Sequence, residues 1–178
     1  DIEGIYYDIY RNIEISFEEG HAYYVTVDGV TYNKDMTKVE FCSKNYVGDY
    51  VMPDTVTDIN SMAFYNIDGL TSVVVSDQVT EIVYATFASC KNLKSVELPE
   101  GLVSIGMYAF RDTPLLDGVV LPETLMDIGN GAFEISGIKS ITIPDSCEYI
   151  SYNAFKNSRI ETLDLGEGVV EIDSMAFG

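Results

Sequence analysis

The sequence CKNLKSVELPEGLVSIGMYAF, residues 90–110, recurs in varied form along the chain and decides its fold. Its final phenylalanine repeats at intervals of 23, 23, 23, 22 and 22 residues. The members of this series are Phe64, Phe87, Phe110, Phe133, Phe155 and Phe177. An isoleucine stands five residues before each Phe, and a small residue directly precedes each Phe. Three registers that repeat together at one period indicate a repeat array.

Each unit also contains a short stretch of alternating apolar residues, such as Val96 and Leu98. Alternation with a period of two predicts a strand that is buried on one face. In five units a further apolar residue lies three positions upstream, as at Leu93, and completes the pattern LxxLxL. Proline follows the pair directly in four units. Because proline cannot donate the next hydrogen bond of a sheet, we expect each strand to end there.

After a polar turn, every unit has a second apolar step that ends in isoleucine, as in LVSI at residues 102–105. The chain then enters the short AF segment, which we interpret as a helical turn or an irregular arc whose Phe fills the interior. One unit cannot bury its apolar stripe alone, so neighbouring units must stack. The sequence therefore predicts a β-rich solenoid with 22–23-residue units, in which each buried Phe contributes roughly 1.5–3 kcal/mol.

The units resemble the BspA-type leucine-rich repeats. In residues 90–110 the resemblance rests on LxSVxLP followed by LxSIGxxAF, and in residues 28–64 on a YNKD turn between two strands. It covers residues 28–178 and implies a leucine-rich-repeat solenoid wound as a right-handed superhelix. This family occurs mostly on the surfaces of host-associated bacteria and some protozoa, and several members are described as adhesins. The resemblance therefore implies an extracellular interaction role.

This pattern divides the chain into three parts. Residues 1–27 are rich in Tyr and Ile and are interpreted as an N-terminal β-hairpin cap, because a solenoid needs its terminal apolar face covered. Residues 28–48 form a diverged hairpin that leads into the array, and residues 49–178 hold about six leucine-rich repeats. The last repeat is incomplete at Gly178, so we expect a longer parent protein and an open strand edge at this end.

Composition argues against several functions. The formal net charge is −19, and residues 49–178 carry −14 of it, from 20 acids and 6 bases, which opposes binding to nucleic acid. No apolar run approaches the roughly 20 residues that span a bilayer, so we expect no membrane insertion by this segment. Cys42, Cys90 and Cys147 form no CxxC pair, and His21 is the single histidine. No metal site, cofactor or catalytic triad is indicated, and we predict a non-enzymatic chain.

A partner-binding face is predicted on the strands. Successive strand residues point to opposite faces, so the residue between each buried pair projects outward. We call these six positions the outer column: Val51, Val74, Glu97, Val120, Thr142 and Asp164. Exposed valines suit a protein-binding patch, although β-branched residues also simply favour strands. A second candidate is the set of tyrosines on the AF segments, Tyr84, Tyr108 and Tyr152.

These patterns favour a cell-surface or secreted interaction module of the adhesion type, which binds a protein partner through the outer column. A host extracellular protein is one candidate partner. The alternative is a structural spacer within a larger surface protein. An enzyme would need a deep pocket with convergent polar groups, which a flat sheet face does not offer. The sequence leaves the oligomeric state open.

Overall fold

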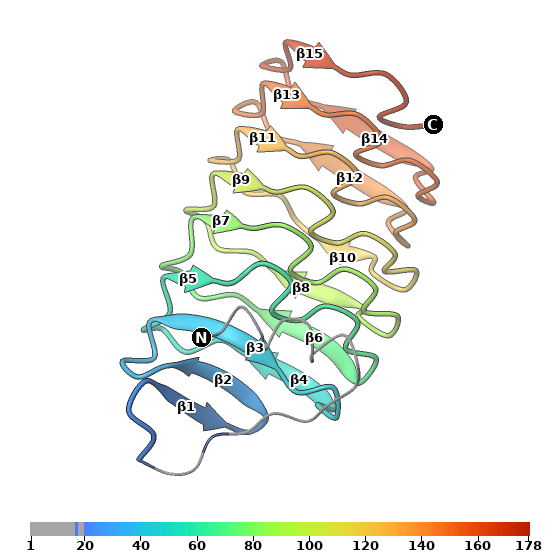
Figure 1. Cartoon of the computed structure of the whole chain (residues 1–178). Helices are drawn as coiled ribbons and strands as arrows, with labels where there is room; N and C mark the ends of the chain where they lie inside the picture. Colours follow the sequence, from blue (N-terminus) through green and yellow to red (C-terminus); the bar gives the residue numbers. More distant parts are fainter. Residues whose placement is uncertain (1–16, 18–19) are drawn as a thin grey trace.

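In the computed structural model, which describes residue 17 and residues 20–178, the chain winds into a β-solenoid (Figure 1). The described residues contain strands, turns and bends but no helix. Successive coils stack along one axis and place every Phe of the series one coil above the last. The predicted solenoid of 22–23-residue units is confirmed. Strands expected before residue 17 lie outside the described residues.

The segments with alternating apolar residues form one set of strands, and these pair in parallel with their neighbours except between β10 and β12. They are β4 (Gly48–Val51), β6 (Leu70–Val74), β8 (Ser95–Glu97), β10 (Gly118–Val119), β12 (Ser140–Ile143) and β14 (Thr162–Leu165). The first four form one sheet in the order β10-β8-β6-β4, and β12 pairs only with β14. The strands end before or at the slot that proline fills, as the sequence predicts.

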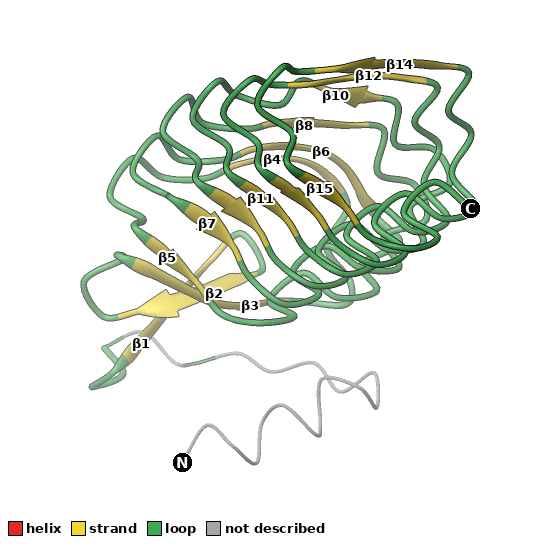
Figure 2. Ribbon diagram, turned by 90° about the horizontal axis from the view of Figure 1, so that it is seen from above, coloured by secondary structure: helices red, strands yellow, loops and turns green. Residues whose placement is uncertain are grey.

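A second parallel sheet is built from the isoleucine-ending steps, which the sequence analysis left without a strand assignment. Its members are β7 (Glu81–Ile82), β9 (Ser104–Ile105), β11 (Asp127–Ile128), β13 (Tyr149–Ile150) and β15 (Glu171–Ile172). All five pair without interruption in the order β15-β13-β11-β9-β7. The two sheets lie on different sides of each coil, so the solenoid has two strand-lined walls (Figure 2).

Antiparallel strands cover the first coil. β1 (Tyr24–Val27), from the predicted cap, pairs with β2 (Val30–Asn33) of the predicted hairpin. β2 pairs in turn with β3 (Lys38–Cys42), and β3 pairs in parallel with β5 (Asp58–Ile59) of the first coil. The expected YNKD turn joins β2 to β3, where the Asn33 side-chain oxygen accepts the backbone N–H groups of Thr37 and Lys38 at 2.8 and 2.9 Å. Strand β3 therefore converts antiparallel pairing into the parallel pairing of the array.

The interior is organised by a column of stacked aromatic rings, which we call the phenylalanine spine. Its ring centroids lie 5.1–5.4 Å apart from Phe64 to Phe177, and the interplanar angle falls from 23° at the first pair to 1° at the last. The rings from Phe64 to Phe155 are fully buried. At the cap end Tyr50 continues the column, 5.0 Å from Phe64. The spine is the centre of a single apolar core.

The AF segments are irregular arcs, one of the two forms that the sequence analysis allowed. In every coil the residue two before Phe has a left-handed backbone, with φ between 50° and 63°, and in five coils the residue two after Phe does too. Each arc is tied to the next by its Phe, whose N–H donates to the carbonyl of the small residue before the next Phe, as from Phe87 to Ala109 at 2.8 Å. A small residue is needed there because the backbones of adjacent arcs approach closely.

Candidate interaction surface

The outer column projects from the wall formed by β4 to β14, on the side opposite the core. Val51 and Val120 are 68% and 84% exposed. Glu97, Thr142 and Asp164 are also exposed, whereas Val74 is half-buried between its neighbours. The structure therefore places all six predicted residues on one wall, and five of them are exposed.

The wall itself is divided, whereas the sequence predicts a continuous stripe. Hydrogen-bonded pairing stops between β10 and β12. There the Asp117 carboxylate, in place of a backbone carbonyl, accepts the Lys139 backbone N–H at 3.0 Å and binds its ammonium group at 3.2 Å. These bonds hold the pKa of Asp117 below its ordinary value. The division falls where the coil shortens from 23 to 22 residues, because the arc after Phe133 has one residue fewer before the next strand.

An open hollow of about 730 Å³ lies on this wall over β6, β8 and β10. Its middle is formed by the outer-column members of these three coils. Small residues lower one side of it, and acidic residues form the opposite rim. The small residues are Ser72, Ser95 and Gly118, and the acidic residues are Asp77, Glu100 and Glu123. The hollow exists because a small residue stands beside a larger outer-column side chain, Val74, Glu97 or Val120, in each of three consecutive coils.

The acidic rim extends along the whole array. In each of the six coils an exposed acid stands two residues after the last apolar position of the strand motif. We call this set the acid row: Asp54, Asp77, Glu100, Glu123, Asp145 and Glu167. Neighbouring strands lie about 4.8 Å apart, so the row carries one carboxylate at roughly that interval. The sequence analysis missed the row, although an acid after Pro, Ser or Gly in every unit is a plain signal for it.

Charge is segregated around the coil. All six Lys and Arg of residues 49–178 lie in the arcs between a Phe and the next strand. The three ion pairs that the described residues form are in these arcs: Lys91 with Asp112, Arg111 with Glu134, and Lys139 with Asp117. Three of the six basic residues of the repeats are thus paired with neighbouring acids. Within residues 49–178, no Lys or Arg lies on the side of the coil that carries the exposed acids of the acid row.

The tyrosine set is only partly brought together. Tyr84 and Tyr108 meet edge to face with ring centroids 6.2 Å apart, beside a hollow of about 250 Å³. Tyr152 lies further along the array, where its hydroxyl approaches the Met175 sulfur at 3.7 Å. The Arg111 guanidinium stacks over the Tyr108 ring, 5.1 Å from its centroid. The three tyrosines therefore do not form one shared patch.

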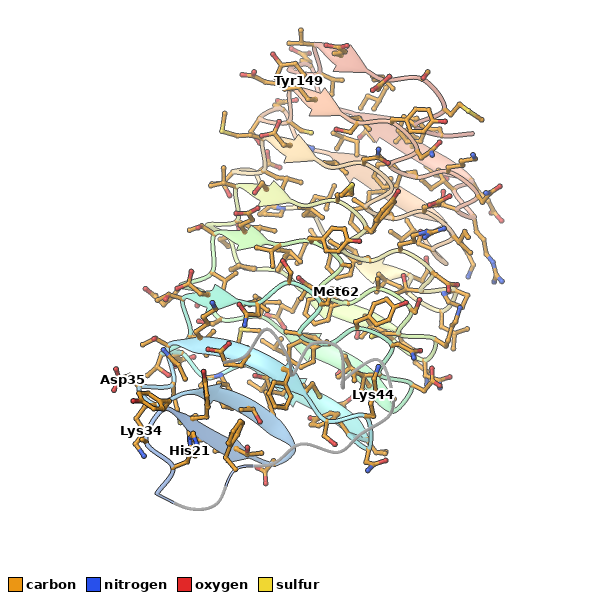
Figure 3. The ribbon with its side chains drawn as sticks, in the orientation of Figure 1. His21, Lys34, Asp35, Lys44, Met62 and Tyr149 are labelled. Carbon is orange, nitrogen blue, oxygen red and sulfur yellow. The ribbon has the colours of Figure 1, made fainter. Side chains whose placement is uncertain are left out.

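The histidine and the cysteines, whose side chains could act in catalysis or bind a metal, lie apart from one another and have structural roles. His21 lies with Lys34 at the hairpin end of the molecule, far from Tyr149 (Figure 3). Its Nδ1 accepts the backbone N–H groups of Tyr23 and Tyr24 at 3.3 and 3.2 Å.

The three cysteines are buried and unpaired with one another. Burial raises the pKa of the Cys90 thiol to about 12 and that of Cys147 to about 11, and also raises the pKa of Cys42, so all three remain neutral thiols at pH 7.

Within residue 17 and residues 20–178, no three His, Cys, Asp or Glu are arranged to hold a metal ion. The same residues contain no helix able to cross a membrane.

The chain forms coils of 22 and 23 residues around a phenylalanine spine, with two walls of parallel strands. These features define a leucine-rich-repeat solenoid. The chain belongs to the family described as the BspA type leucine rich repeat region, whose sequence profile matches residues 57–178 in six copies. The family predicted from the repeated motifs is confirmed. No curated protein matches the chain.

Solved structures with the same fold come from several bacteria. The pneumococcal vaccine antigen PcpA aligns with a TM-score of 0.69 and 22% identity, over 87% of this chain and 37% of PcpA. A leucine rich repeat protein of T. pallidum aligns with a TM-score of 0.62 and 22% identity, over 89% of this chain and 86% of that protein. A leucine rich cell surface protein of Faecalibacterium prausnitzii gives 0.52 and 22%, over 81% and 40%. The chain thus spans little more than a third of PcpA.

Proposed function

We propose that this chain is a cell-surface or secreted interaction module that binds a protein partner through the wall carrying the outer column. The observation that carries this proposal is the hollow of about 730 Å³ over β6, β8 and β10, which is lined by the 84% exposed Val120. Exposed apolar side chains rimmed by polar residues are typical of protein-binding surfaces. The site offers shape and surface complementarity and no reactive group.

Surface location and adhesion are the finer parts of the proposal. Support comes from two proteins of the same fold, one described as a vaccine antigen and the other as a cell surface protein. The function of an adhesin requires an accessible face of limited mobility, and two hydrogen-bonded walls around a packed spine provide one. A host extracellular protein is the partner class that we propose for this face.

The test is capture of extracellular-matrix and serum proteins by the immobilised chain. The variant Val51→Asp, Val120→Asp places two charges on the outer column, where both side chains are exposed, so folding should be unaffected. Val74 is left intact because it is half-buried. The matched control is Val103→Asp, Val170→Asp, which changes two valines that are 39% and 73% exposed on the other wall. Equal melting temperatures of the three proteins are established first.

We expect the wild type and the control to capture a partner and the outer-column variant to lose it. Equal capture by all three proteins would move the binding site away from this wall. Capture by none of them would favour the alternative function, a structural spacer whose stacked coils hold other domains apart.

A further inference from the structure

The hollow over β6, β8 and β10 has a neighbour on the same wall. A second hollow of about 340 Å³ continues along the same wall over β12 and β14, and Glu123 lines both. The second hollow is lined by Thr142 and Asp164 of the outer column and by Asp145 and Glu167 of the acid row. The two hollows adjoin at Glu123 and follow one another across the coils, and we call them together the acid groove.

The acid groove has charge of one sign. Its lining includes seven acids and no Lys or Arg. The basic residues of the repeats lie in the arcs, where several are already paired with acids. A cleft lined by one sign of charge concentrates oppositely charged groups and accelerates their association. The electrostatic field of this groove therefore selects a cationic ligand.

The groove is also partly apolar, and this defines the kind of cation that fits. Val74 and Val120 stand in its middle, beside the acid row. Lys and Arg side chains combine an apolar stem with a charged head, so the stem can lie on the valines while the head reaches a carboxylate. A bare metal ion would use only the acids. The small residues Ser72, Ser95 and Gly118 leave room for the backbone of a ligand on the other side of the valines.

We propose that the acid groove binds an extended segment of a partner protein that carries several lysines or arginines. This inference rests on the proposed function and names the chemistry of its partner. The segment lies across the strands, its backbone over the small residues, its apolar stems on Val74 and Val120, and its charged heads on the acid row. Electrostatic attraction governs the rate of encounter, and the valines retain the bound segment.

The experiment uses the chain as it stands and a fluorescein-labelled decapeptide of alternating arginine and threonine. Binding is followed by fluorescence anisotropy with EDTA present, at about 50 and 200 mM NaCl, and a glutamate–threonine decapeptide is the ligand control. The test variant neutralises the rim by Asp77→Asn, Glu100→Gln and Glu123→Gln. The matched control makes the same change in net charge on the other wall, by Asp58→Asn, Glu81→Gln and Asp127→Asn.

We expect the arginine peptide to bind the wild type, to bind more weakly at the higher salt concentration, and to lose about tenfold or more in affinity for the rim variant. The matched control should lose less than about twofold, and Val120→Ser about threefold. Equal losses in both triple variants would reduce the effect to net charge and overturn the proposal. Failure of the arginine peptide to bind the wild type, or equal binding of the glutamate peptide, would overturn it too.

The two proposals can fail separately. If capture of a matrix or serum protein is lost in Val51→Asp, Val120→Asp but unchanged in the rim variant, the wall is an interaction site and its partner is not cationic. If the arginine peptide binds as expected and no protein is captured, the groove has the proposed chemistry and the partner lies outside the matrix and serum proteins tested.

Discussion

The phenylalanine spine and the outer column have the same period but opposite character. The spine repeats one residue type in every coil, and its rings from Phe64 to Phe155 are fully buried. The outer column holds four residue types at its six positions and is almost wholly exposed. Tyr50 and Val51 show the contrast within one strand, because Tyr50 is 6% exposed and continues the spine while Val51 is 68% exposed.

The difference separates packing from surface chemistry. A ring in the spine must match the ring above and the ring below, so any departure in one coil leaves a gap against two neighbours. An outward residue has no such partner, so its identity is free to vary with what the wall contacts. Repetition of one apolar residue in every coil therefore reports packing, and the valines and acids of the outer wall report its surface properties.

The largest expected effect comes from shortening a side chain of the spine, compared with shortening one of the outer column. Phe110→Ala should lower the free energy of unfolding by about 3–5 kcal/mol, because it removes a ring stacked 5.4 Å from Phe87 and 5.2 Å from Phe133 and leaves a cavity. Val120→Ala, on the outer column, should change it by less than about 0.5 kcal/mol. Urea unfolding of both variants measures the difference. Similar losses in the two would remove the distinction between spine and outer column.

A smaller effect is expected where the spine meets the cap. The hydroxyls of Tyr32 and Tyr50 are buried and hydrogen-bonded to each other at 2.8 Å. Tyr50→Phe keeps the ring but leaves the Tyr32 hydroxyl unpaired, which should cost about 1–3 kcal/mol. The double variant Tyr32→Phe, Tyr50→Phe removes both hydroxyls and should recover most of that loss in thermal or urea unfolding. A double variant no more stable than the single one would show that the hydroxyl pair is not the cause.

The smallest effect concerns the arcs, where backbone shape matters more than burial. Ile135 is a β-branched residue with φ of 59°, a conformation that costs such residues about 1 kcal/mol. Ile135→Asn should therefore raise the free energy of unfolding by about 0.5–1 kcal/mol. The reverse change at the equivalent position, Asn66→Ile, should lower it by a similar amount. Opposite shifts in melting temperature are the expected result, and shifts of the same sign would contradict it.

The sequence predicts the inward half of this molecule well. The period, the strands and the spine follow from apolar registers, because each register records a contact that recurs in every coil. The second sheet was missed because its strands, such as Glu81–Ile82, are only two residues long, too short for alternation to be visible. The left-handed arcs were missed because Met62, Ala85 and Tyr108 have no preference for that conformation. Stacking imposes it on them.

The candidate surface is a mixed case. The outer column could be placed by alternation alone, because the direction of a strand side chain follows from its position. The division between β10 and β12 could not, since it depends on a side chain, Asp117, that replaces a backbone acceptor. The acid row could have been found, because it keeps a fixed register from Asp54 to Glu167. The acid row was missed because acids are expected on any protein surface, so their register was not compared between units.

The regular spacing of the acid row gives the array a measurable reach. Six carboxylates at intervals of about 4.8 Å extend over about 24 Å, which is the length of roughly seven residues of extended chain. Each added or deleted coil would lengthen or shorten that distance by about one and a half residues. The number of repeats would then act as a ruler, which sets the length of peptide that the wall can accommodate independently of the residues that contact it.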